Sequence, residues 1–214
     1  MILHGYWRSG ASYRTRIALN LKGLAYDQQP VDLRKGEQSA ETYRGLSGQA
    51  LVPALELDDG QVLVQSPAIL EWLEETHPQP PLLPRSPRDR ATVRAMCAVI
   101  GCDVQPLNNL RVLKAVRALG ADEDGVNRWA QGWIEQAFNI FAPMARRHGG
   151  DWCFGDTPTL ADCYLIPQIY SARRFGVDMS GWTNLTAIEA RAADHPAFAA
   201  AHPDRQPDAD APAS

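Results

Sequence analysis

Apolar and polar residues follow two different rhythms along the chain, and the change falls near residue 80. Before that point, short apolar runs typical of strands stand between stretches with helical spacing. The pattern predicts a strand over residues 2–7, a helix ending near Gly23, an edge strand over 25–31 and a weak polar helix or irregular segment over 37–46. Antiparallel strands are predicted over 51–57 and 61–64, on either side of the turn Asp58-Asp59-Gly60, and they are followed by a helix that opens at Ser66.

The order of these segments predicts an α/β domain over residues 1–80, with a mixed four-stranded sheet and helices on both faces. Ser66 is expected at the N-cap of its helix and Pro67 at the first helical position. Pro53 cannot donate to a central ladder, so an edge, a turn or a cis peptide bond is expected there. Residues 77–87 contain five prolines and are interpreted as an inter-domain linker.

Beyond the linker, the spacing is helical throughout and predicts an all-α domain over residues 88–203. The pattern predicts helices over 91–100, over 105–119, from Asp122 or Asp124 to Gly149, from a capping box at Thr159 and Asp162, and over 184–193. Pro, Asp and Ala dominate residues 204–214, which have little to bury, so a disordered tail is expected there.

Composition narrows the class of protein. The net charge of −4, with no basic run or zinc pattern, argues against nucleic-acid binding and predicts no metal site. No apolar run reaches the ~18 residues of a membrane span, and the N-terminus lacks a signal-peptide pattern. The four cysteines form no C-x-x-C motif and are interpreted as reduced thiols of a cytoplasmic protein.

The turn after the first predicted strand carries the first candidate chemistry. Arg8, Ser9, Ser12 and Arg14 stand where a helix begins, and a helix N-terminus offers free N–H groups and a positive dipole end. Such a turn can hold a thiolate or a carboxylate. On this turn alone, the simpler interpretation is that Ser9 or Ser12 only caps the helix.

A small α/β domain, a proline-rich linker and an all-helical domain together resemble the cytosolic glutathione transferases, whose N-terminal domain is thioredoxin-like. Val52-Pro53 resembles the family's cis-proline, Gln65-Ser66 its γ-glutamyl site, and residues 155–162 the folding box of its C-terminal domain. Within the family, the zeta class is the most similar, through the segments 8–19, 105–110 and 167–175. One departure is clear: Ser9-Gly10-Ala11 stands where Ser-Ser-Cys is usual, so no protein thiol is available there.

The resemblance implies a glutathione-dependent isomerase of maleylpyruvate or maleylacetoacetate, acting by thiolate addition, bond rotation and elimination, and a homodimer. It places the glutathione thiol at Ser9 and the peptide's backbone contact at Val52 and Pro53. Ser66 would seat a carboxylate, although simple helix capping is the alternative. The neutral polar residues assigned to glutathione are Gln38, Gln65, Gln105 and Asn109, of which Gln38 could equally be a solvated loop residue.

Arginine suits the two carboxylates of the substrate, because it is always charged and binds carboxylates through two hydrogen bonds. The fold is expected to turn Arg8, Arg111 and Arg174 towards one cleft, with Arg8 and Arg174 catalytic. An exposed ion pair is the alternative for each, and Arg173 could replace Arg174. A structural role is expected for Arg14, Arg16 and Tyr6. A conjugating or peroxide-reducing transferase and a non-catalytic binding module remain as alternatives, whereas a thiol–disulfide oxidoreductase does not fit an N-terminal domain without cysteine.

Overall fold

Four short strands form one mixed sheet in the N-terminal part of the chain, in the order β2-β1-β3-β4. In the computed structural model, which describes residues 1–209, β1 (Ile2–Gly5) pairs in parallel with β2 (Asp27–Pro30) and antiparallel with β3 (Ala54–Glu56). β3 continues antiparallel to β4 (Val62–Val64). The predicted topology is confirmed, and β2 lies at the edge, where Pro30 leaves no central ladder bond unmade.

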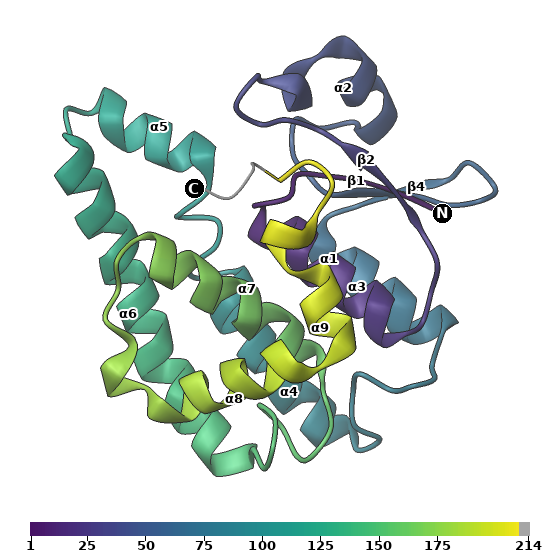
Figure 1. The fold of residues 1–214 in the computed structure, drawn as a ribbon, viewed down its shortest axis with the longest axis vertical. Helices are drawn as coiled ribbons and strands as arrows, with labels where there is room; N and C mark the ends of the chain where they lie inside the picture. Colours follow the sequence, from purple (N-terminus) through teal and green to yellow (C-terminus); the bar gives the residue numbers. More distant parts are fainter. Residues whose placement is uncertain (210–214) are drawn as a thin grey trace. The chain divides into compact units, whose positions relative to one another are not determined.

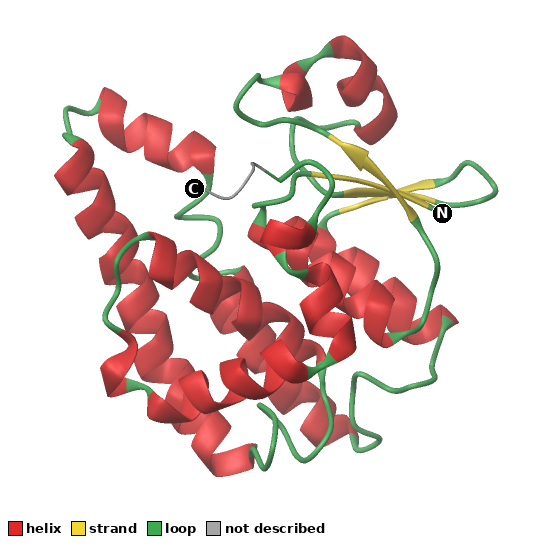
Figure 2. Ribbon diagram, in the orientation of Figure 1, coloured by secondary structure: helices red, strands yellow, loops and turns green. Residues whose placement is uncertain are grey.

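Helices cover both faces of this sheet, as predicted. Figure 2 shows α1 (Gly10–Leu21) and α3 (Ser66–Thr76) on one side of the strands and α2 (Glu41–Ser47) on the other. α1 and α3 pack against each other. A short 3-10 helix, Glu37–Ser39, precedes α2. Under α2 lies an apolar cluster of buried residues with partly buried neighbours: Val31, Tyr43 and Ala54, with Leu46, Val52, Val62 and Val64.

Two compact units make up the chain, and their division differs from the predicted domains. The first unit combines residues 1–81 with the C-terminal segment from residue 193, and the second comprises residues 82–192. The predicted boundary at residue 203 is therefore wrong, because α9 (Pro196–Ala201) packs on α1 rather than within the helical unit. Figure 1 shows this yellow segment returning beside the purple α1.

The expected disordered tail is also wrong over residues 204–209. A 3-10 helix, Pro203–Arg205, follows α9, and the next residue, Gln206, is buried. Its side-chain Nε2 donates to the carbonyls of Ala200 and His202, at 2.9 and 2.7 Å. Side-chain hydrogen bonds therefore help to hold this stretch, and apolar patterning does not reveal them. The remainder of the predicted tail, residues 210–214, lies outside the described residues.

The second unit is helical, as predicted, with α4 packed on α6 and α7, and α5 packed on α6. Its helices are α4 (Pro87–Gly101), α5 (Leu110–Ala118), α6 (Glu123–His148), α7 (Leu160–Arg174) and α8 (Thr183–Asp194), and a 3-10 turn spans Met179–Gly181. The last two residues of α8 are assigned to the first unit. No helix in the described part of the chain combines the length and apolarity needed to cross a membrane.

Polar residues define where these helices begin. Asp122 caps α6, and the predicted capping box of Thr159 and Asp162 opens α7. Asp162 is fully buried, and its carboxylate accepts hydrogen bonds from the backbone N–H groups of Cys153 and Thr159, at 2.9 and 2.7 Å. Burial raises the pKa of this carboxyl, while these hydrogen bonds oppose the rise. The helix predicted over 105–119 is shorter, because residues 105–108 form turns, Asn109 is the N-cap and α5 begins at Leu110. The helix predicted over 91–100 begins earlier, at Pro87.

Candidate functional site

Four segments that carry predicted site residues leave the sheet at one end of its strands. This border is formed by strand ends and not by an edge strand, and it is the edge at which the site lies. β1 and β2 run in parallel, so both end there, whereas β3 runs the other way and begins there, and β4 ends there again. The register pairs closest to this edge are Gly5 with Pro30, His4 with Ala54, and Ala54 with Val64. The edge therefore gathers the turn with Arg8 and Ser9, the loop leading to Gln38, the dipeptide Val52-Pro53 and the dipeptide Gln65-Ser66.

Ser9 caps α1. Its Oγ accepts a hydrogen bond from the backbone N–H of Ser12, at 3.3 Å, so the capping interpretation is confirmed. The Oγ of the buried Ser12 in turn accepts from the N–H of Tyr6, at 3.3 Å. A hydroxyl that accepts still has its own proton to donate. Ser9 can therefore cap the helix and donate to an anion at the same time.

Cations and aromatic rings surround this turn. The guanidinium of Arg8 lies 5.3 Å from the ring centre of Trp7, and that of Arg34 lies 5.8 Å from the ring centre of Tyr6. Burial raises the pKa of the Tyr6 phenol, although Arg8 and Arg34 both act to lower it. The phenol therefore stays protonated at neutral pH, in agreement with the packing role expected for Tyr6.

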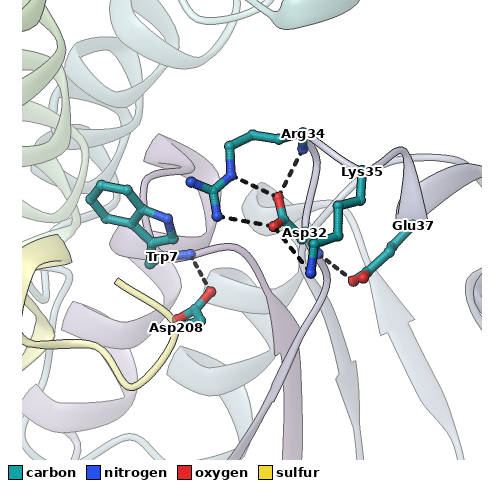
Figure 3. Close-up of polar contacts among 6 residues, drawn as sticks. All are labelled: Trp7, Asp32, Arg34, Lys35, Glu37 and Asp208. Carbon is teal, nitrogen blue, oxygen red and sulfur yellow. Dashed lines mark hydrogen bonds and ion pairs between the residues drawn. The ribbon is translucent and has the colours of Figure 1, made fainter. Parts of the chain in front are cut away.

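The loop after β2 is held by a group of charged side chains (Figure 3). Asp32 accepts from the Nε and Nη2 of Arg34, at 3.0 and 2.9 Å, and Lys35 Nζ lies 3.9 Å from the same carboxylate. Hydrogen bonds from Arg34 are the main cause that lowers the pKa of Asp32 to about 2. The carboxylate of Glu37 accepts from the N–H of Asp32 at 2.7 Å, which closes the loop just before Gln38.

Gln38 offers a hydrogen-bond acceptor that the protein itself does not use. Its side-chain Oε1 is buried and has no hydrogen-bond partner among the described residues. A buried carbonyl oxygen without a partner is costly unless a ligand or water satisfies it. Of the two interpretations of Gln38, this observation favours ligand binding over a solvated loop residue.

The two dipeptides at the edge have unusual backbones. The Val52–Pro53 peptide bond is cis, as the resemblance implies. Gln65 has φ of 67° and ψ of 107°, and it is the one non-glycine residue with positive φ among residues 1–209. Such a backbone costs of order 1–3 kcal/mol and persists where the surroundings impose it. The side chain of Gln65 donates to Gln49 Oε1 at 2.8 Å.

Ser66 is the first residue of α3 and not, as the sequence predicts, its N-cap. Gln65 occupies the N-cap of α3, because its carbonyl already accepts from the N–H of Ile69 at 3.0 Å, and Ser66 is the first helical residue. The first N–H groups of a helix have no partner within the helix, and Pro67 has none to offer. The N–H and hydroxyl of the buried Ser66 therefore stand where an anion can be bound.

In the helical unit, the segment 105–109 is tied to α6. Trp129 Nε1 donates to the carbonyl of Leu107 at 3.1 Å, and Asn108 Nδ2 donates to the carbonyl of Ala130 at 3.3 Å. Asn109 caps α5, where its Oδ1 accepts from the N–H of the exposed Arg111 at 3.2 Å. This capping uses the oxygen of Asn109 and leaves its amide nitrogen to donate. Gln105 begins the segment, with its N–H on the carbonyl of Ile100 at 3.0 Å.

The end of α7 is tied to the same stretch of α6. Gln131 Nε2 donates to the carbonyl of Phe175 at 2.7 Å, and the guanidinium of Arg174 lies 5.5 Å from the ring centre of Phe175. Arg173 instead pairs with Glu189. The structure thus brings the segment 105–109 and Phe175, the neighbour of Arg174, to residues 129–131 of α6.

Several contacts at these segments were not predicted. They involve Gln49, Gln131, Asp32 with Arg34, and the C-terminal Asp208, whose Oδ2 accepts from the N–H of Trp7 at 3.0 Å. The contact of Asp32 with Arg34 is local, because Asp32 Oδ1 also accepts from the N–H of Arg34 at 2.9 Å in an Asx turn. Each of the other contacts pairs residues whose neighbourhood depends on the fold.

The chain matches the family model of the glutathione S-transferase N-terminal domain over residues 8–76 and that of the C-terminal domain over residues 127–202. A maleylacetoacetate isomerase of Pseudomonas aeruginosa is 48% identical over 97% of this chain and 98% of its own.

Solved structures agree with this match. A maleyl pyruvate isomerase described as a bacterial zeta-class glutathione S-transferase has a TM-score of 0.95 and 47% identity, over 98% of this chain and 100% of its own. The maleylacetoacetate isomerase of Anaeromyxobacter dehalogenans with glutathione bound in its active site has a TM-score of 0.88 and 43% identity, over 98% of this chain and 97% of its own.

Proposed function

The chain belongs to the glutathione S-transferase family, and we propose from this premise that it is a zeta-class, glutathione-dependent cis–trans isomerase of a maleyl keto acid. The observation that carries the proposal is the convergence of Ser9, Gln38, Val52-Pro53 and Ser66 on one edge of the sheet. The two substrates in view are maleylpyruvate and maleylacetoacetate.

The residues at the edge match the functional groups of glutathione. Ser66 offers a hydroxyl and an N–H to the γ-glutamyl carboxylate, next to Gln65. Gln38 offers its unpartnered Oε1 to an N–H of the peptide. Val52, before Pro53, offers its backbone to the cysteinyl portion, and Gln105 and Asn109 are the polar residues of the helical unit assigned to the same ligand.

Ser9 and Arg8 stabilise negative charge on the bound thiol. When bound, glutathione supplies a thiolate whose reversible addition to the C=C bond permits rotation about that bond. Lowering a thiol pKa from ~8.5 by ~1–2 units requires about 1.4–2.7 kcal/mol in favour of the anion. The hydroxyl of Ser9, the N-terminus of α1 and the charge of Arg8 are three sources that can supply this amount together.

Arginines bind the carboxylates of the substrate in this proposal. Arg8, Arg111 and Arg174 are assigned to them, with Arg8 and Arg174 acting as catalytic residues. The pairing of Arg173 with Glu189 argues against Arg173 as the substrate arginine, because a guanidinium that holds one carboxylate through two hydrogen bonds is already committed. Arg111 is exposed at the first turn of α5.

A thiol of the protein itself plays no part in this chemistry. All four cysteines, Cys97, Cys102, Cys153 and Cys163, lie in the helical unit, and none of these described residues forms a disulfide. Burial raises the pKa of the Cys153 thiol well above its usual value, which makes the thiol unreactive. The proposal therefore depends on the thiol of glutathione.

The test follows the ultraviolet absorbance of each maleyl keto acid with purified protein. The assay is run with glutathione, without it, and with S-methylglutathione, which has no thiol. We expect conversion to the fumaryl isomer only with glutathione, and the faster substrate identifies the physiological one. Absence of conversion for both acids, with glutathione still bound, would refute the isomerase and favour a conjugating transferase or a binding module.

We also propose a cytoplasmic homodimer. Cysteines that form no disulfide among the described residues are typical of a reducing compartment, and the family resemblance implies the dimer. Sedimentation equilibrium of the purified chain tests the dimer, since a monomer at micromolar concentration would contradict it. Fractionation of cells that express the protein tests the compartment.

A further inference from the structure

Hydrogen bonds hold the two peptide groups on either side of the Trp7 α-carbon. The N–H of Trp7 donates to Oδ2 of Asp208 at 3.0 Å, as Figure 3 shows, and its carbonyl accepts from Nη2 of Arg16 at 2.9 Å. Trp7 is the second residue of a turn that the N–H of Ser9 closes onto the carbonyl of Tyr6, at 3.0 Å. Both contacts therefore act on the turn that carries Ser9.

The C-terminal segment supplies one contact directly and the other through Arg16. The guanidinium of Arg16 is only 1% exposed, and its Nε donates to the carbonyl of Ala201, the last residue of α9, at 3.0 Å. A buried guanidinium is stable only where its donors are satisfied. Arg16 thus links the end of α9 to the carbonyl of Trp7 across the interior of the first unit.

Further contacts fix the segment that delivers Asp208. Gln28 Nε2, on the edge strand β2, donates to Oε1 of the buried Gln206 at 2.8 Å. Asn20, on α1, donates to the carbonyl of Ala197 at 2.9 Å. The stretch between Ala197 and Gln206 is therefore attached to both β2 and α1, and Asp208 follows two residues later.

We propose that Asp208 is a positioning residue for the turn that binds the glutathione thiol. It does not touch the thiol; it holds the N–H of Trp7 and thereby sets the direction in which the hydroxyl of Ser9 points. A charge-assisted hydrogen bond is stronger than a neutral one, so a carboxylate suits this task. The inference rests on the proposed function for its catalytic consequence, but its structural content can be measured without substrate.

The experiment compares Asp208→Ala and Asp208→Asn with the control Asp204→Ala. Asp204 is exposed on the same segment, and its Oδ2 lies 3.7 Å from Nδ1 of His202. Asp208→Asn keeps an oxygen that can accept from Trp7 and removes the charge. All variants and the wild-type protein are first compared by thermal unfolding, to confirm that each is folded.

The first readout is hydrogen–deuterium exchange of the amides of residues 7–12 in the protein without glutathione. We expect roughly tenfold faster exchange in Asp208→Ala, because a hydrogen bond to a charged group contributes on that scale. Asp208→Asn should be intermediate and Asp204→Ala unchanged. Equal exchange in Asp208→Ala and Asp204→Ala would overturn the proposal, whether or not the protein is an isomerase.

The second readout is the pKa of the bound glutathione thiol, from its thiolate absorbance against pH. We expect a rise of about half to one unit in Asp208→Ala, equivalent to a threefold to tenfold loss of thiolate below that pKa. A purely structural role would lower the melting temperature and leave this pKa unchanged, and that result would also overturn the proposal. Failure of the isomerase assay in the wild-type protein refutes the proposed function alone, because neither readout uses the maleyl keto acid.

Discussion

Arg173 and Glu189 form an ion pair with two hydrogen bonds, from Nε to Oε1 at 2.8 Å and from Nη2 to Oε2 at 2.5 Å. The neighbouring Arg174 instead lies beside the ring of Phe175, whose carbonyl is held by Gln131. Two adjacent arginines with the same charge thus have different surroundings. This difference provides a matched pair of variants for the proposed substrate site.

We expect Arg174→Ala to raise the KM for the maleyl keto acid at least tenfold, because a charged hydrogen bond to a carboxylate contributes about 1.5–3 kcal/mol. The KM for glutathione should change little. Arg173→Ala removes an exposed ion pair worth about 0–1 kcal/mol of stability and should leave both constants near wild type. Steady-state kinetics with each substrate varied in turn measures the difference, and an equal loss in both variants would contradict the assignment of Arg174.

Gln131→Ala tests whether α6 positions the end of α7. Loss of the hydrogen bond to the carbonyl of Phe175 should let Arg174 move and raise the KM for the keto acid about threefold to tenfold, in line with one hydrogen bond of about 1 kcal/mol. Glutathione affinity should stay constant. The control is Gln136→Ala, an exposed position on the same helix. Isothermal titration with glutathione and initial rates with the keto acid separate the two effects, and an unchanged KM would refute the positioning role.

Ser9→Ala removes both functions of the hydroxyl. Because the hydroxyl is one of three sources that stabilise the thiolate, we expect the pKa of bound glutathione to rise by about one unit and the rate at neutral pH to fall about tenfold. Loss of the cap should also cost about 1 kcal/mol of stability. Asp122→Ala removes the cap of α6 at a similar cost and should leave the thiol pKa unchanged. Ser9→Thr, which keeps a hydroxyl, should recover much of the activity; a rate in Ser9→Ala equal to wild type would exclude Ser9 from catalysis.

Asp32, in the loop before Gln38, makes the stability of the folded protein depend on pH. Its folded pKa of about 2 lies below its ordinary value of ~3.9, so the carboxylate stabilises the folded protein at pH values above ~4. That contribution is lost as pH falls from ~4 through about 2. Wild type should therefore exceed Asp32→Asn in stability at pH 6, and the gap should close near pH 2. Urea unfolding at several pH values, with Glu75→Gln as an exposed control, measures this gap; a constant gap would contradict the Arg34 contact.

Local pattern was sufficient where the physical cause is local. Asp122 and the Thr159–Asp162 capping box bond within three residues, and the change from strand to helical spacing near residue 80 reflects burial periodicity. The N-cap predicted at Ser66 is wrong by one position, because the backbone conformation of Gln65 makes Gln65 the cap and Ser66 the first helical residue. The sequence does not reveal the turns over 105–109, because Leu107 continues the spacing of Leu110 and Leu113 although the helix begins only after Asn109.

The prediction from composition was least accurate at the C-terminus, over residues 204–209. A stretch of Pro, Asp and Ala buries little and was expected to be disordered, yet Gln206 is buried and Asp208 reaches Trp7, about two hundred residues earlier in the chain. Hydrogen bonds of this kind depend on a partner that only the folded chain brings near. No periodicity in residues 204–209 indicates them.

The sequence by itself determined the strand and helix order, the mixed sheet, the glutathione transferase resemblance and the residue types available for a thiol and carboxylates. These follow from spacing and side-chain chemistry, which are properties of the chain before it folds. Tertiary structure alone decided that Ser9, Gln38, Pro53 and Ser66 leave one edge of the sheet, since strand direction and register bring them there. It also decided which of Arg173 and Arg174 is paired with Glu189, because a partner sixteen residues away is chosen by packing and not by sequence.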